Sequence, residues 1–112
     1  MPFFDLQKQP SKIIFPGVRI TTAWGEHLML SFVDFEYGGA EVPTHQHRHE
    51  QMGVGISGEF ELTIDGETRV IRAGDSYLVP GNVPHSARSL GPSRALDVFH
   101  PIREDYTGEI GG

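Results

Sequence analysis

The clearest chemical signal in this sequence is a pair of histidines separated by one residue, His45 and His47. In an extended strand, residues i and i+2 project from the same face, so the two imidazoles can point towards one site. Neutral imidazole is a good ligand for divalent transition metals. Because two ligands are too few for a stable protein site, others must come from elsewhere in the chain.

Further donors compete to complete this ligand set. His85 follows the rigid Pro-Gly-Asn-Val-Pro segment at 80–84, which can fix the direction of its ring. Gln51 and Glu50 compete for the fourth place, and strand alternation favours Gln51, which is in phase with the two histidines. A turn near Arg48 would break that alternation and leave Glu50 open. The predicted ligands of one divalent ion are His45, His47, Gln51 and His85.

A glutamine in the ligand set has a chemical consequence. Three neutral imidazoles and one amide oxygen leave the full dipositive charge on the ion, which makes it a strong Lewis acid towards oxygen-rich molecules. The same ligand set contains no anion that would stabilise a higher oxidation state of the metal. Non-redox chemistry is therefore favoured, and the ion stays open among nickel, zinc, manganese and iron.

A second group of candidate residues lies near the end of the chain. Asp97 and Phe99 share one face of a predicted strand, and Arg103 follows a proline-containing stretch. A carboxylate buried within an apolar strand is costly without a partner, so Asp97 requires a ligand, a hydrogen-bond network or a catalytic role. The guanidinium fork of Arg103 suits a carboxylate substrate. Spacing alone slightly favours a structural pair, either Asp97–Arg103 or Asp97–backbone.

Short strands must position both groups. The chain has 14 Gly and 8 Pro among 112 residues, and few windows have a helical period. Apolar and polar residues alternate at 59–64, and Asp65-Gly66 suits a type I′ turn into 67–71. His27 and Trp24 are interpreted as packing residues. Further strands are predicted at 18–23, 27–35, 42–57 (two strands), 76–79, 85–89 and 95–99.

The expected organisation is one all-β domain covering residues 1–112, with its core at about 17–103. The N-terminal arm, 1–16, is expected either to be loose or to add a strand to a partner. The C-terminal tail, 104–112, is expected to fray from about Tyr106. Exposed sheet edges predict a homodimer.

Composition argues against several classes of protein. The net charge of −6 and the scattered arginines disfavour nucleic-acid binding. No apolar run approaches the ~20 residues of a membrane helix, so no membrane partner is expected. The chain has no cysteine, which excludes disulfides and thiol catalysis. Without a signal-peptide pattern at 1–9, a cytoplasmic location is expected.

Two spaced motifs resemble those of the cupin superfamily. Residues 39–58 read Gly-x5-His-x-His-x3-Gln-x6-Gly, the spacing of the first cupin motif with Gln where Glu is usual. Residues 74–85 read Gly-x5-Pro-x4-His, as in the second motif, although Asn82 replaces a usual Gly and Ser89 stands where Asn is common. The resemblance covers about 39–89 and implies a single-domain jelly-roll barrel, the double-stranded β-helix, that holds one metal ion.

The residues near the end of the chain indicate a resemblance to one family within the cupins. Residues 97–106 read Asp-Val-Phe-x-Pro-x-Arg-Glu-Asp-Tyr, which together with His-x-His-x3-Gln is similar to the KdgF family of pectin and alginate degradation. That resemblance implies an enzyme that linearises 4,5-unsaturated monouronates to open-chain keto-deoxyuronates. Asp97 would be the general acid/base and Arg103 the clamp on the substrate carboxylate. The implied substrate-binding residues are Phe99, Arg103 and Gln51.

Other functions stay open at this stage. A cupin-type metal-dependent oxygenase would prefer iron, and Gln51 and Arg103 weigh against it. A non-catalytic module that binds a sugar or an acid would usually carry a DNA-binding domain, for which 112 residues leave no space. An isomerase of another sugar acid could use the same site. His49, Glu50 and Tyr106 are candidate pocket or rim groups, for each of which a structural role is preferred.

Overall fold

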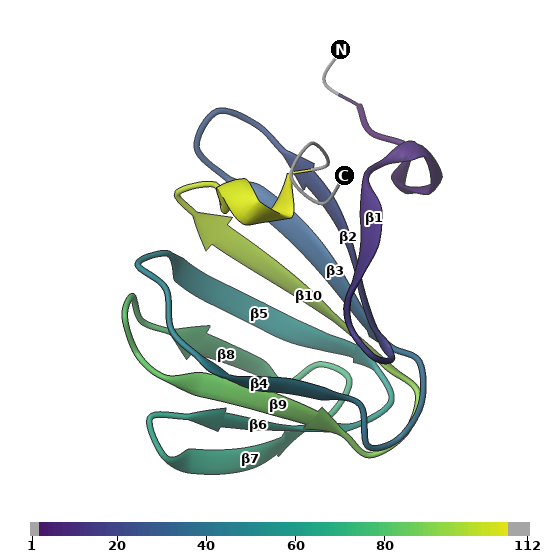
Figure 1. The fold of residues 1–112 in the computed structure, drawn as a ribbon, viewed down its shortest axis with the longest axis vertical. Helices are drawn as coiled ribbons and strands as arrows, with labels where there is room; N and C mark the ends of the chain where they lie inside the picture. Colours follow the sequence, from purple (N-terminus) through teal and green to yellow (C-terminus); the bar gives the residue numbers. More distant parts are fainter. Residues whose placement is uncertain (1–2, 108–112) are drawn as a thin grey trace.

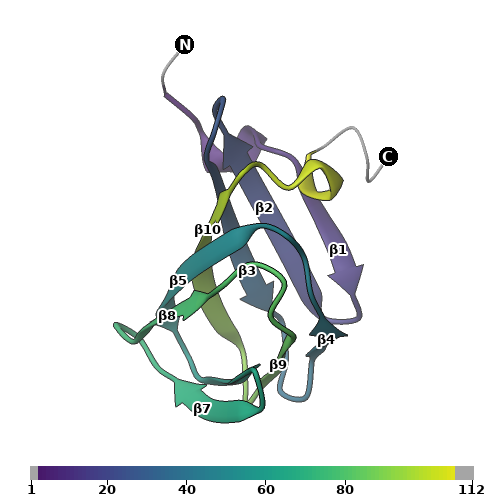
Figure 2. The same cartoon turned by 90° about the vertical axis from the view of Figure 1, so that its left-hand side faces the viewer.

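The structure, a computed structural model, describes residues 3–107 and is almost entirely β. The strands form a six-stranded sheet, in the order β1-β2-β3-β10-β5-β8, and a four-stranded sheet, in the order β4-β9-β6-β7. Figure 1 shows the strands of the first sheet in this order, and Figure 2 shows the two sheets facing each other as a jelly roll. The strands are β1 (Ser11–Phe15), β2 (Val18–Trp24), β3 (Met29–Phe35), β4 (Glu41–His45), β5 (Glu50–Ser57), β6 (Phe60–Ile64), β7 (Glu67–Ile71), β8 (Ser76–Val79), β9 (His85–Ser89) and β10 (Ser93–His100).

The β6–β7 hairpin shows how local sequence sets these elements. Asp65 and Gly66 have φ angles of 49° and 83°, the two positive values that a type I′ turn requires. The register places Phe60 opposite Ile71 and Ile64 opposite Glu67. Phe60 and Leu62 point between the sheets, while Glu61 and Thr63 alternate with them. The predicted hairpin is confirmed.

The apolar core fills one end of the space between the sheets. Val18, Phe35, Phe60, Leu62 and Ile71 are buried there. The rings of Phe35 and Phe60 lie 5.4 Å apart, within the range of favourable aromatic contacts. In the antiparallel pairing of β10 with β5, the rung of Ala95, a core residue, lies five rungs away from the rung that joins His100 and Glu50. The opposite end of the barrel is therefore left for polar side chains.

The chain ends differ from the sequence prediction. Residues 11–15, expected to be part of an arm, form β1 at the edge of this chain's own sheet and pair with β2. Gly17, with φ 75°, allows the tight reversal between them. Residues 104–106 of the expected tail form a short 3₁₀ helix, η2 (Glu104–Tyr106), beyond the end of β10 (Figure 1). Residues 1–2 and 108–112 lie outside the described part.

His27 and Trp24, both interpreted as packing residues, differ in their burial near the β2–β3 connection. His27 is not a packing residue, because its side chain is 73% exposed in the loop between the two strands. The strand predicted to start there begins at Met29 instead, since periodicity does not fix where a strand ends. Trp24 is half-buried at the end of β2.

The two helices among the described residues, η1 (Leu6–Lys8) and η2, have three residues each. Neither approaches the length and apolar character that a membrane crossing requires.

Candidate metal centre and its pocket

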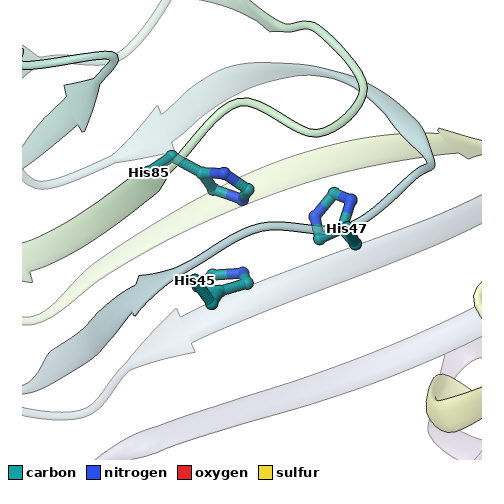
Figure 3. A group of neighbouring side chains, drawn as sticks. All are labelled: His45, His47 and His85. Atoms are coloured by element: carbon teal, nitrogen blue, oxygen red, sulfur yellow. The ribbon is translucent and has the colours of Figure 1, made fainter.

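Three histidines meet at the polar end of the barrel. His45 is the last residue of β4 and His85 the first of β9, and the two lie directly opposite each other in the sheet. His47 follows in the turn between β4 and β5. One nitrogen from each ring lies within 4.8 Å of the others, and Figure 3 shows the three rings grouped around a common space. The strand pairing therefore brings together the residues that the two sequence motifs contribute.

Main-chain hydrogen bonds orient each of these rings. The Nδ1 atoms of His45, His47 and His85 lie 2.9, 3.1 and 2.8 Å from the carbonyl oxygens of Pro43, His49 and Val83. Because a carbonyl only accepts, each Nδ1 carries the proton and donates it, which leaves each Nε2 with a free lone pair.

The free nitrogens fit a metal ion. Among the described residues, Nε2 of His47 and Nε2 of His85 are buried without a hydrogen-bond partner. A buried acceptor with no partner is unfavourable, and coordination of a cation would satisfy it. Imidazole donors suit divalent transition ions, so the chemistry of the donors and their orientation agree.

The electrostatics keep the three rings neutral. Burial lowers the pKa of His45, His47 and His85, and the nearby charge of Arg103 lowers it further. The pKa of His47 falls to about 4. Neutral imidazole is the form that coordinates metals, so the protein presents the rings ready for binding at neutral pH.

Gln51, the second residue of β5, lies next to this group. It is buried and lines the same pocket as His45 and His85, whereas Glu50 is exposed. Its side-chain oxygen, Oε1, is also buried without a partner in the described part of the chain. The alternation argument for an inward Gln51 is thus correct, even though a turn does occur at residues 46–49.

His49, the fourth histidine of this segment, is placed differently. It is buried in the turn, and its Nε2 lies 3.4 Å from Oε1 of Glu104, at the start of η2. His49 therefore links the turn to the end of the chain.

Asp97 and Phe99 both point into the barrel from β10, as predicted from their shared strand face. Asp97 does not pair with Arg103 or with the backbone: its Oδ1 accepts a hydrogen bond of 2.6 Å from the hydroxyl of Tyr77, on β8. Arg103 instead forms a two-armed ion pair with Asp105, with Nε–Oδ1 3.2 Å and Nη2–Oδ2 2.7 Å. Arg103 pairs with the nearby Asp105 because both residues lie beyond the end of β10, whereas Asp97 lies deeper in the barrel.

A glycine makes the Tyr77–Asp97 contact possible. Gly53 on β5 pairs with Tyr77 on one side and with Asp97 on the other. A Cβ atom at Gly53 would overlap both the Asp97 carboxylate and the Tyr77 ring. The missing side chain therefore leaves the space in which the hydroxyl reaches the carboxylate across the intervening strand.

The pKa of the Asp97 carboxyl is raised by its position in the pocket. Burial raises its pKa to about 6, although hydrogen bonds from Tyr77 and Gln51 and the charge of Arg103 oppose that rise. Burial and the Asp97 charge raise the pKa of Tyr77, so its hydroxyl stays protonated and donating.

Aromatic rings and a guanidinium form the wall of the pocket. Cζ of Arg103 lies 3.7 Å from the centre of the Tyr106 ring and 5.3 Å from that of Phe99. The Phe99 ring also lies 5.7 Å from His47, edge to face. This single pocket is lined by His45, Gln51, His85, Tyr77, Asp97, Phe99, Arg103 and Tyr106.

Sequence reasoning missed Tyr77 and Gly53. Both left a signal in the sequence: Tyr77 is at an inward position of a predicted strand, and a glycine within a strand often marks a close approach. Tyr106, a possible pocket or rim group in the sequence, lines the pocket.

We expect Gly53→Ala to destabilise the fold by roughly 1–3 kcal/mol, because the added methyl group must displace Tyr77 or Asp97 in a packed interior. Urea unfolding measures this change. Gly25→Ala is the matched control, since a Cβ there meets no atom within 4 Å and should leave stability unchanged. Equal stability of Gly53→Ala and the unmodified chain would contradict the tight Tyr77–Asp97 arrangement.

Known proteins resemble this chain in sequence and in architecture. The family described as "Cupin domain" matches residues 31–99. The pectin degradation protein KdgF of Dickeya dadantii (strain 3937) is 34% identical over 89 residues, which cover 79% of this chain and 81% of that protein.

Two solved structures agree with this relationship over nearly the whole chain. KdgF from Halomonas sp. has a TM-score of 0.85 and 33% identity, with 94% of this chain and 97% of that chain covered. An RmlC-like cupin from Shewanella frigidimarina NCIMB 400 has a TM-score of 0.88 and 32% identity, with 96% of each chain covered. The two motifs, the jelly roll and these relatives agree: the chain belongs to the cupin family, and within it to the small cupins related to KdgF.

Proposed function

We propose that this chain is a metal-dependent enzyme that linearises 4,5-unsaturated monouronates from pectin or alginate breakdown to open-chain keto-deoxyuronates. One observation carries the proposal: a single pocket is lined by His45 and His85 of the three-histidine group, together with a buried carboxyl and a guanidinium. The relationship to KdgF, a pectin degradation protein, supports the choice of substrate. The cytoplasmic location stays a prediction.

His45, His47 and His85 would hold the divalent ion through Nε2, with Gln51 Oε1 as the fourth ligand. Nickel, zinc, manganese and iron all suit this donor set. When bound, such an ion supplies Lewis-acid stabilisation of negative charge on substrate oxygens.

Asp97 is proposed as the general acid/base. The reaction is an isomerisation: one proton leaves a ring hydroxyl as the ring opens, and one proton is added to the carbon of the enol double bond. A single carboxyl that first accepts and then donates a proton balances this change. Asp97 is suited to the task because it is buried in the pocket, and Tyr77 is proposed as the positioning residue that holds it through the 2.6 Å hydrogen bond.

Arg103 is proposed to bind the uronate carboxylate, with Phe99 as an adjoining wall. Its guanidinium lies over the Tyr106 ring and forms an ion pair with Asp105, which together fix its orientation in the pocket. A planar fork held in this way can present two parallel N–H donors to a carboxylate.

We expect Arg103→Lys to raise KM roughly tenfold with a smaller change in kcat, because lysine keeps the positive charge but lacks the paired N–H donors of the guanidinium. Initial rates over a range of substrate concentrations separate the two parameters. Arg88→Lys is the control, since Arg88 lies on the outer face of β9 between Glu41 and Glu61. An unchanged KM in Arg103→Lys would remove Arg103 from substrate binding.

The reaction itself can be observed directly. Unsaturated galacturonate monomer absorbs in the ultraviolet through its double bond, and this absorbance disappears as the ring opens. Metal-loaded protein is expected to accelerate the disappearance well beyond the spontaneous decay. Oxygen uptake, followed in parallel, distinguishes this reaction from that of an oxygenase.

A further inference from the structure

A groove on the surface leads into the pocket between the two sheets. It lies between β1 and β4, which are edge strands of the six-stranded and the four-stranded sheet. Figure 2 shows both strands on the same side of the barrel. The groove and the pocket are one continuous space, because both are lined by Ile14, Val42, His45, Arg103 and Tyr106.

The pocket alone is too small for a monosaccharide. Its volume is about 60 Å³, which has room for roughly five water molecules. A pyranose ring with its carboxylate and hydroxyl groups is larger than that. The groove adds about 330 Å³, which is a volume typical of small-molecule sites. A sugar acid that reaches Asp97 must therefore extend into the groove.

Lys12, on β1, brings a positive charge to this groove. It is half-buried on the same strand face as Ile14, and its Nζ donates a hydrogen bond of 3.1 Å to the main-chain oxygen of Asp105. Among the described residues, no carboxylate oxygen lies within 4.0 Å of this nitrogen, whereas every arginine of the chain has such a partner. The ammonium is therefore available to a ligand.

The charges along the groove leave a positive site in an acidic chain. Asp105 forms an ion pair with Arg103 at an Nη2–Oδ2 distance of 2.7 Å, so these two charges cancel. Burial lowers the pKa of His45 and keeps it neutral, so the net positive charge of the groove comes from Lys12, although the chain carries −6. A cleft with one sign of charge attracts ligands of the opposite sign. The groove therefore favours an anion over a neutral molecule.

We propose that Lys12 is a second binding residue for the carboxylate of the sugar acid, beside Arg103, and that it sets the preference of the site for anionic substrates. Both side chains contact Asp105: Arg103 binds its carboxylate, and Lys12 binds its main-chain oxygen. The ammonium offsets the repulsion that the Asp105 carboxylate exerts on an incoming anion, and it offers charge-assisted hydrogen bonds. This inference rests on the proposed function, in which Arg103 binds the same carboxylate.

Calorimetric binding of galacturonate, a saturated relative of the proposed substrate, to the metal-loaded chain tests the role of Lys12. Lys12→Met is expected to weaken binding roughly tenfold, because methionine keeps a long apolar stem but lacks the ammonium. Lys12→Arg keeps the charge and should bind galacturonate nearly as well as the unmodified chain. The methyl ester of galacturonate has the same ring without the charge, so Lys12→Met should not change its affinity.

Lys8→Met is the matched control for this series. It removes the same charge from an exposed position on η1, and Lys8 does not line the groove. Its affinity for galacturonate should equal that of the unmodified chain, which separates the local effect of Lys12 from a change in net charge.

Turnover of unsaturated galacturonate monomer provides a second readout. Lys12→Met should raise KM roughly tenfold and leave kcat nearly unchanged, since the ammonium binds the substrate carboxylate equally before and during the reaction. A chain that binds galacturonate in a Lys12-dependent way without any turnover would contradict the proposed reaction and support the role of Lys12.

Two results would overturn this role. The first is galacturonate binding that is equally tight in Lys12→Met and in the unmodified chain. The second is an equal loss of affinity for galacturonate and for its methyl ester, because Lys12 would then act only by holding η2 in place through Asp105.

Discussion

His85→Ala is expected to lower metal affinity roughly 100-fold or more and to yield nearly metal-free protein on purification. His85 carries a buried Nε2 without a hydrogen-bond partner among the described residues and lies directly opposite His45 in the sheet. Removing it leaves two imidazoles and one amide, too few strong donors for a stable site. Elemental analysis of protein produced without a histidine tag measures the bound ion, and titration with zinc, nickel or manganese gives the affinity.

His27→Ala is the control for this experiment. His27 is exposed in the β2–β3 loop, and this loop does not contribute to the site. It should bind as much metal as the unmodified chain. Full metal content in His85→Ala would show that the ion is held elsewhere, and the three-histidine site would be wrong.

Asp97→Asn is expected to lower kcat roughly 10²- to 10⁴-fold, the range typical for loss of a general acid or base. Asparagine has the same shape and keeps an oxygen that can accept the Tyr77 hydroxyl, so the pocket should retain its geometry. Metal content should not change. The decay of the double-bond absorbance measures the rate, and elemental analysis of the same sample measures the metal.

Asp34→Asn is the matched control, because Asp34 is a partly exposed aspartate on the outer face of β3, paired with Arg94. It should leave kcat unchanged. If metal-loaded Asp97→Asn were as active as the unmodified chain, Asp97 would have no acid/base role, even with the reaction correctly identified.

The grouping of the proposed metal ligands could be predicted from sequence, because their positions depend on local geometry and on a known motif spacing. Two-residue alternation places His45 and His47 on one side, and it also selects Gln51 over the exposed Glu50. His85 required the second motif, since no local rule tells which distant strand lies beside β4. The pairing of His45 with His85 shows why that motif spacing works.

The environment of Asp97 could not be predicted, because it depends on the order of strands within the sheet. Tyr77 is 20 residues away from Asp97 in the sequence and reaches it across β5 only because Gly53 has no side chain. Sequence spacing favoured Arg103 or the backbone as the partner of Asp97, yet Arg103 forms its ion pair with Asp105, two residues later. Similarly, residues 11–15 were expected to be a loose arm or to add a strand to a partner, whereas the hairpin at Gly17 pairs them with β2 of the same chain.

The most direct test of the central claim combines metal content with turnover in one series. Tag-free protein is stripped with a chelator, reloaded in steps with one divalent ion, and assayed on freshly generated unsaturated galacturonate monomer. The account predicts that the rate of double-bond loss rises in proportion to bound metal and levels off at about one ion per chain, as expected for a single four-ligand site. A rate that stays at the spontaneous value in fully loaded protein would contradict it.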